Sequence, residues 1–196
     1  MGSWQVWLLA LGGLVYFASA SLYSFFGRIA FDFSSLLQLP DALPLVVTHF
    51  LAGLSEEILF RGLVLYALIR VWGRSTLGIL RSVLLASALF SLVHISQVFT
   101  YGTSLSSALL LIAQTFVIST WWGALVVWGG SIWPAVLLHF ITNAVVSVQG
   151  LAMPVVEPVI LAYRNYLWFS LPLGLLAAGW MAKTCLAPRE HWASKV

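Results

Sequence analysis

Six ionisable or amide side chains interrupt the apolar stretches of this chain, in three groups whose spacing suggests shared chemistry. They are Glu56, Glu57 and Arg61 in the first group, His94 in the second, and His139 with Asn143 in the third. An ionisable group inside an apolar span costs roughly 2.5–3.5 kcal/mol at the helix centre, so such groups are functional candidates by default. Carboxylates and imidazoles are the usual general acids and bases of enzymes. The pattern therefore predicts acid–base chemistry in an apolar environment.

The two adjacent glutamates of the first group are expected to differ in their partners. Glu57 precedes Arg61 by four residues, the favoured order for an ion pair along one helix. Glu56 lies about 100° further round that helix and has no partner there. A nearby imidazole would give Glu56 a hydrogen bond and tune it for base chemistry. The alternative for the Glu57–Arg61 pair alone is a structural link between spans.

The histidines of the later groups could supply the rest of such a site. His139 and Asn143 are also four residues apart, so both project from one helix face, and two converging donors are what a developing oxyanion requires. His94 is a candidate catalytic imidazole, and the alternative is a histidine that only bonds a neighbouring helix. His49, seven residues before Glu56, is expected to pack or to line a pocket.

The composition indicates the elements that must position these groups. Of 196 residues 61% are hydrophobic and 8% are charged, whereas about a quarter of the residues of a soluble domain are charged. Apolar runs of about 20 residues between short polar breaks predict a polytopic helical membrane protein. The predicted helices span residues 4–26, 42–72, 77–99, 104–128, 132–149 and 158–182. We therefore expect an all-α transmembrane bundle of about six spans, with the site between helices 2, 3 and 5.

The predicted organisation is a single integral membrane domain, residues 1–196, with a core at 42–148 and flanking spans and termini at 1–41 and 150–196. Within the second helix, Gly53 and Ser55 allow a kink or a fresh helix start just before Glu56. The N-terminal stretch lacks a basic n-region, which favours a retained span over a cleaved signal. A lone cysteine, Cys185, excludes an internal disulfide and a cysteine-based metal cage.

The basic residues favour a topological role over nucleic-acid binding. The nine lysines and arginines form no stripe, although the net charge is +3, so we expect no nucleic-acid partner. Arg70, Arg74 and Arg81 cluster in one connection, and more basic residues follow the last span, which places that connection and both termini in the cytoplasm. At about 1.5 Å per residue, Glu56 and His94 each lie roughly 20 Å from this side. The site is then reached more easily from the extracytoplasmic leaflet.

Three motifs in this order carry a family resemblance. E-E-x-x-x-R begins at Glu56, F-x-x-x-H joins Phe90 to His94, and H-x-x-x-N joins His139 to Asn143. Together they resemble the CAAX protease and bacteriocin-processing family of intramembrane endopeptidases, which includes the type II CAAX prenyl endopeptidases. The resemblance covers roughly residues 42–148, about half of the chain.

The resemblance implies a role for each matching position. Glu56 and His94 would activate a water molecule for attack on the scissile carbonyl. His139 and Asn143 would stabilise the oxyanion. Three supporting residues would orient and tune the site: Glu57, Arg61 and Phe90, the last by packing against the imidazole of His94.

We therefore expect an intramembrane glutamic-type endopeptidase, without a cofactor or metal, in a prokaryotic inner or plasma membrane. Its substrate would be a membrane-inserted or secreted peptide, such as a leader, an anchor or a C-terminal sorting tail, and the lipid bilayer its surroundings. CAAX-type prenyl-protein processing is the alternative substrate class. A zinc enzyme that uses His94, His139 and a glutamate is a second alternative. A non-catalytic scaffold or a transporter-like binder is the third.

Overall fold

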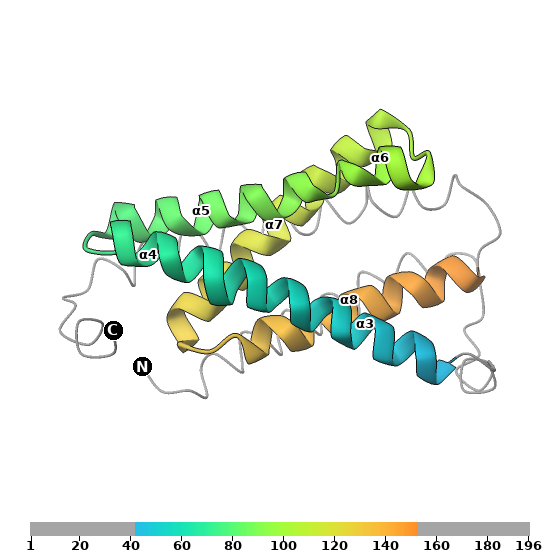
Figure 1. The fold of residues 1–196 in the computed structure, drawn as a ribbon, viewed down its shortest axis with the longest axis horizontal. Helices are drawn as coiled ribbons and strands as arrows, with labels where there is room; N and C mark the ends of the chain where they lie inside the picture. The colour runs from blue at the N-terminus through green and yellow to red at the C-terminus, as the bar shows by residue number, and fades with distance from the viewer. Residues whose placement is uncertain (1–41, 153–196) are drawn as a thin grey trace, which may run out of the picture.

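The computed structural model describes residues 42–152, and for residues 144–152 it gives only the helical backbone. Within that range the chain is helical and contains no strand (Figure 1). The elements in chain order are α3 (Ala42–Glu57), the π-helix η1 (Ile58–Leu65), α4 (Tyr66–Trp72), α5 (Thr76–Val93), α6 (Ser96–Tyr101), α7 (Leu105–Gly129) and α8 (Trp133–Ala152). The four central predicted helices are thus confirmed as helical. The predicted helices at 4–26 and 158–182 lie outside the described residues.

Two helical stretches are long and apolar enough to cross a membrane, Thr76–Tyr101 and Leu105–Gly129. Large apolar side chains on these stretches face outward, as Leu92 and Leu109 do with 54% of their surface exposed. Such exposure suits a lipid environment, since soluble monomers rarely expose large apolar patches. The membrane character of the fold follows from these two helices, and the total of six spans stays a prediction.

The second predicted helix is one rod made of α3, η1 and α4 (Figure 1). No fresh helix starts at Ser55, because α3 continues through this residue and its hydroxyl donates to the carbonyl of Ala52 at 2.9 Å. The irregularity comes directly after Glu57, where eight residues adopt a π-helix. π-Helical segments inside α-helices are frequent at functional sites. The widened turn therefore begins where the acidic pair ends.

The third predicted helix divides at His94. α5 ends at Val93, His94 is its C-cap residue, and the short helix α6 follows from Ser96. His94 therefore lies at a helix end rather than inside a continuous span. Two later breaks are made by glycine, since Gly102 and Gly130 have φ values of 64° and 65°, which glycine adopts without steric cost.

The helices pack mainly as two pairs, α5 along α7 and α3 along α8 (Figure 1). Gly53 lets the second pair approach closely, because a Cβ there would lie 3.3 Å from the backbone nitrogen of Phe140. α7 is held to its neighbours by apolar side chains, with Val83 of α5 and Leu138 of α8 in its two buried clusters. The close approach of α3 to α8 places the acidic pair next to His139.

Candidate active site

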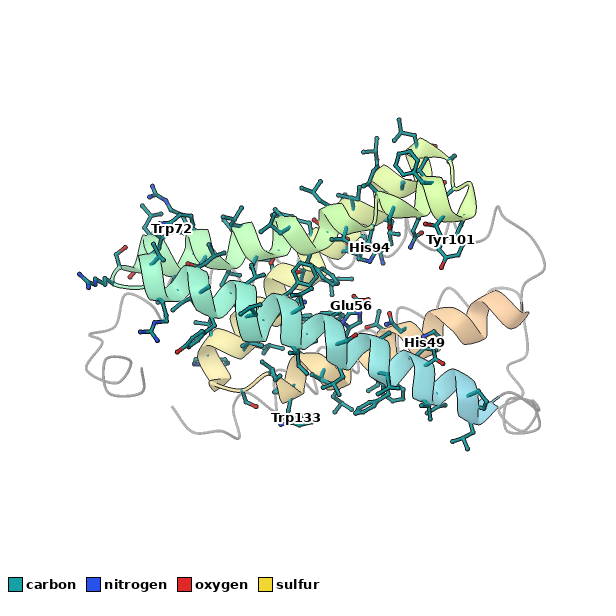
Figure 2. All side chains as sticks on the ribbon, in the orientation of Figure 1. His49, Glu56, Trp72, His94, Tyr101 and Trp133 are labelled. Atoms are coloured by element: carbon teal, nitrogen blue, oxygen red, sulfur yellow. The ribbon has the colours of Figure 1, made fainter. Side chains whose placement is uncertain are left out.

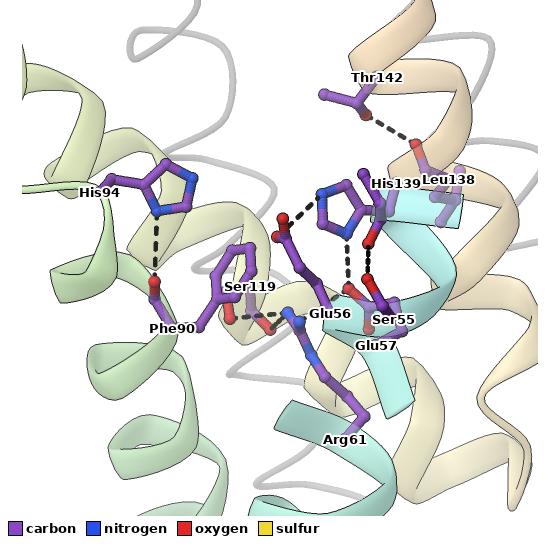
Figure 3. Close-up of polar contacts among 11 residues, drawn as sticks. Ser55, Glu56, Glu57, Arg61, Phe90, His94, Ser119, Leu138, His139 and Thr142 are labelled. Carbon is purple, nitrogen blue, oxygen red and sulfur yellow. Dashed lines mark hydrogen bonds and ion pairs between the residues drawn. The ribbon is translucent and has the colours of Figure 1, made fainter. Parts of the chain in front are cut away.

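The most buried part of the site is an ionic group built on Glu57. Its carboxylate is fully buried, and Oε1 lies 2.7 Å from Nη1 of Arg61, which confirms the predicted ion pair. The same oxygen lies 2.9 Å from Nδ1 of His139 (Figure 3). A carboxylate paired with a guanidinium only accepts hydrogen bonds, so Nδ1 of His139 donates. Glu57 thereby links α3 to α8, a contact that the sequence did not predict.

α7 completes the surroundings of Arg61. Nη2 donates to the hydroxyl of Ser119 at 2.7 Å and approaches the Ser119 carbonyl at 3.4 Å. The guanidinium also lies over two aromatic rings, 4.7 Å from the centroid of Phe90 and 5.6 Å from that of Trp122. Paired charge, hydrogen bonds and aromatic faces are what make a buried cation tolerable. Arg61 is therefore enclosed by groups from three segments, α3, α5 and α7.

Glu56 has a different environment from its neighbour. Its side chain is 40% exposed, and Oε2 lies 3.6 Å from Nε2 of His139. That separation suits an ion pair and is too long for a direct hydrogen bond. The sequence predicted His94 as the imidazole beside Glu56, whereas His139 makes the short contact.

His94 faces Glu56 from the end of α5 (Figure 3). Its Nδ1 lies 3.2 Å from the backbone carbonyl of Phe90. Because a carbonyl only accepts, Nδ1 is the donor, and in the neutral ring Nε2 is left as a hydrogen-bond acceptor. Figure 3 shows this second nitrogen on the side of the ring toward Glu56. Figure 2 places Glu56 and His94 between Trp72 and Tyr101 along the length of the molecule.

Phe90 connects the two imidazoles. Its ring centroid lies 5.2 Å from that of His94 and 5.7 Å from that of His139, both with the rings edge to face. The predicted packing of Phe90 against His94 is confirmed, and its contact with His139 is additional. His139 also packs on Trp122, with 4.9 Å between ring centroids. The ring of Phe90 thus fixes both histidines relative to Arg61.

The structure brings most of the predicted residues together. Asn143 lies one turn after His139 on α8 and is partly exposed, and none of its described contacts joins it to the cluster. His49 lies on α3, about two turns before Glu56 (Figure 2). Within residues 42–152, no three His, Cys, Asp or Glu side chains are arranged to hold a metal ion. The contacts of Ser119 with Arg61 and of Trp122 with His139 were not predicted, because nothing in the spacing of α7 marks them.

The fold and the site define an α-helical membrane protein whose bundle encloses a carboxylate–imidazole cluster. Such clusters serve hydrolysis when water and a substrate bond can reach them. The model of the type II CAAX prenyl endopeptidase Rce1-like family matches residues 38–145, more than half of the chain, and the chain belongs to that family. The resemblance seen in the three motifs is thereby confirmed. Membership implies a protease, a hydrolase of the membrane.

No curated protein and no solved structure matches the chain.

Proposed function

We propose that the chain is an intramembrane endopeptidase in which Glu56 is the general base. The observation that carries the proposal is the contrast between the two adjacent carboxylates. Glu57 is fully buried and bound to Arg61, while the side chain of Glu56 is 40% exposed and makes no hydrogen bond among the described residues. Only Glu56 is therefore open to a water molecule and a substrate. A base must reach the proton that it removes, so accessibility decides between the two.

Water activation uses Glu56 and His94 together. The carboxylate of Glu56 takes a proton from water while the water oxygen forms a bond to the scissile carbonyl carbon. Nε2 of His94, left as an acceptor by the bond from Nδ1 to the Phe90 carbonyl, orients the water through its second hydrogen. Two acceptors on opposite sides of one water molecule fix the direction of its lone pair. This arrangement supplies the orientation that a hydrolytic reaction needs.

The carbonyl oxygen of the substrate becomes an oxyanion in this step, and His139 is the proposed donor to it. Nδ1 of His139 donates to Glu57, so Nε2 is the nitrogen left to face the substrate, and it donates there when the ring carries a proton on both nitrogens. Asn143, one turn further along α8, is the proposed second donor.

Collapse of the tetrahedral intermediate completes the reaction. The carbonyl re-forms, the carbon–nitrogen bond breaks, and the proton held by Glu56 passes to the leaving amine. The products are a new carboxylate and a new amine, and the carboxylate of Glu56 is regenerated. Neither step needs a cofactor. An exposed amide is required, so the substrate must present an unwound backbone at the site.

The proposed substrate is a peptide that enters the site from within the membrane. Arg70, Arg74 and Arg81 are exposed around the α4–α5 connection, and the positive-inside rule puts that connection in the cytoplasm. α5 is continuous from Thr76 to Val93, so His94 lies about 20 Å from Arg81 along the helix. This depth favours a membrane-inserted or secreted peptide that is reached from the opposite leaflet.

Prenyl-protein processing is the second candidate, and the family match favours it. The matching family is described as type II CAAX prenyl endopeptidases, a description that names prenylated CAAX substrates. A prenyl chain would lie in the bilayer beside the outward-facing apolar side chains. The two candidates use the same catalytic residues and differ in the lipid on the substrate.

The test uses the full-length chain in liposomes with two internally quenched peptides, a farnesylated CAAX peptide and an unprenylated transmembrane peptide. Glu56→Gln should lower the cleavage rate by roughly 10²–10⁴-fold while the protein stays folded. Ser55→Ala is the matched control, since its hydroxyl bonds only the Ala52 carbonyl, and it should cleave at the wild-type rate. The wild-type preference between the peptides identifies the substrate class.

Two results would overturn the proposal. An active Glu56→Gln variant would exclude Glu56 as the base. Stoichiometric zinc in the purified protein, with activity lost to a chelator and restored by zinc, would replace the glutamate mechanism by the zinc alternative. Loss of folded protein rather than of activity in both Glu56→Gln and His94→Ala would favour a non-catalytic scaffold.

A further inference from the structure

We infer that Ser119 and Trp122, one turn apart on α7, are positioning residues for Arg61 and His139. The inference rests on the proposed function, which it deepens by adding a fourth helix to the three that carry the motifs. α7 contributes no charged group to the cluster, yet it contacts both Arg61 and His139. The proposed role of α7 is to fix Arg61 and His139, which in turn bind the carboxylate of Glu57.

Ser119 fixes Arg61 from the side opposite to Glu57. Its hydroxyl accepts from Nη2 at 2.7 Å, while Nη1 of the same guanidinium donates to Glu57 at 2.7 Å. The serine is fully buried, so water does not replace it. A planar guanidinium with both ends fixed cannot turn about its long axis. The hydroxyl of Ser119 thereby sets the direction from which Arg61 approaches the carboxylate.

Trp122 fixes His139 through the face of its ring. The indole and the imidazole lie 4.9 Å apart with an interplanar angle of 36°, and the same indole lies 5.6 Å from the guanidinium carbon of Arg61. Phe90 bounds the imidazole on another side, edge to face. A ring held between two aromatic groups and a carboxylate keeps Nε2 aimed at Glu56. Aiming of this kind is what a preorganised oxyanion donor requires.

A purely structural role for the Ser119 hydroxyl explains these contacts less well. Other buried hydroxyls bond within their own helices, as Ser82 does with the Gly78 carbonyl and Thr120 with the Phe116 carbonyl. Ser119 instead reaches a charged residue on another segment, 58 positions earlier in the chain. A hydrogen bond to a charge is about twice as strong as one between neutral groups. Position and partner therefore distinguish Ser119 from its neighbours.

The test compares Ser119→Ala with Thr120→Val in the farnesylated and unprenylated peptide assays. Ser119→Ala should lower kcat by roughly 10–100-fold with KM within about twofold, because a misplaced catalytic group costs that much. Thr120→Val removes an equally buried hydroxyl of the same helix and should keep the wild-type kcat. Ser119→Thr keeps a hydroxyl and should recover most of the rate.

The pH profile of kcat is the readout that a structural role would leave unchanged. Glu56 and Glu57 face His139 from α3, Arg61 faces it from η1, and His94 from the end of α5. In Ser119→Ala the guanidinium of Arg61 is free to move, which changes the charge around the imidazole of His139. The pH profile of kcat should therefore shift along the pH axis, in addition to the lower kcat. A destabilised but correctly arranged site would give a lower rate with the same profile.

The indole is tested by two substitutions at Trp122. Trp122→Phe keeps an aromatic face and should stay within about threefold of the wild-type kcat, whereas the kcat of Trp122→Leu should fall by about tenfold.

The inference is wrong if Ser119→Ala keeps the wild-type kcat and pH profile while Glu56→Gln is inactive, and the proposed function then stands. An equal loss in Ser119→Ala and Thr120→Val also overturns it. An active Glu56→Gln variant overturns the proposed function itself.

Discussion

The polar cluster has a closed half and an open half, although Glu57 of the first and Glu56 of the second are adjacent in the chain. The closed half consists of Glu57, Arg61 and Ser119, all buried, and charge and hydrogen bonds join them into one network. The open half consists of Glu56 and His94, both partly exposed. His139 touches the closed half through Nδ1 and faces the open half through Nε2. The same side chain thus connects the buried half of the cluster to the half for which we propose the reaction.

The difference shows how a single helical step separates two identical side chains. A rotation of about 100° per residue takes Glu57 into the contact between α3 and α8 and leaves Glu56 partly exposed. The two carboxylates are therefore chemically identical and lie in opposite environments. Glu57 should matter for stability first, and Glu56 for activity first. The predictions below break each half in turn.

The largest effect is expected from removing the cation of the closed half. Arg61→Leu removes the guanidinium from the buried Glu57 carboxylate, and breaking such a buried pair costs about 3–5 kcal/mol of folding free energy. Thermal unfolding of the variant in detergent micelles, followed by circular dichroism, measures the loss. The double variant Arg61→Leu with Glu57→Leu removes both charges and should regain most of the stability. A double variant no more stable than Arg61→Leu would show that packing, not charge, dominates there.

The next effect separates the two glutamates directly. Glu57→Gln keeps an acceptor for Arg61 and His139 but removes the charge, and should cost about 2–3 kcal/mol. Glu56→Gln, on a partly exposed side chain, should change the folding free energy by less than about 0.5 kcal/mol. The same unfolding assay measures both variants, and each is the other's control. Equal stabilities would contradict the division into a closed and an open half.

The sequence predicted the local features of this arrangement well. Hydropathy located the end of the helical rod at Trp72 to the residue, and the ends of the next helices to within a few residues. Helical spacing predicted the Glu57–Arg61 ion pair, because both members lie on one segment. Phe90 and His94 were placed in contact for the same reason. Both of these contacts, Glu57 with Arg61 and Phe90 with His94, join residues that are four positions apart.

The features that the sequence did not predict join distant segments or alter the helix itself. Ser119 meets Arg61 across 58 positions, and His139 meets Glu57 across 82. Contacts between residues this far apart in the chain produce no periodic pattern in the sequence. The helix break at His94 was missed because the residues around it contain no glycine or proline. The catalytic roles of Glu56, His94, His139 and Asn143 stay predictions until they are measured.

The smallest effect is expected at the ring that adjoins both halves. Phe90→Leu removes edge-to-face contacts with His94 and His139 and a cation contact with Arg61, and should cost about 1–1.5 kcal/mol of stability. Because both imidazoles lose a fixed neighbour, kcat should fall by about tenfold, the change that 1.4 kcal/mol of barrier produces.

The matched control for Phe90→Leu is Phe50→Leu. Phe50 makes one edge-to-face contact, with Phe140 at 5.8 Å, and touches neither His94 nor His139 among the described ring contacts. It should lose stability by a similar small amount and keep the wild-type kcat. Peptide cleavage measured well below the unfolding temperature of both variants separates the two effects. If both variants lost the same share of activity, general loosening of the bundle would explain the loss. A fall confined to Phe90→Leu would show that the closed half acts on the open half partly through this ring, since Arg61 and both histidines lie against it.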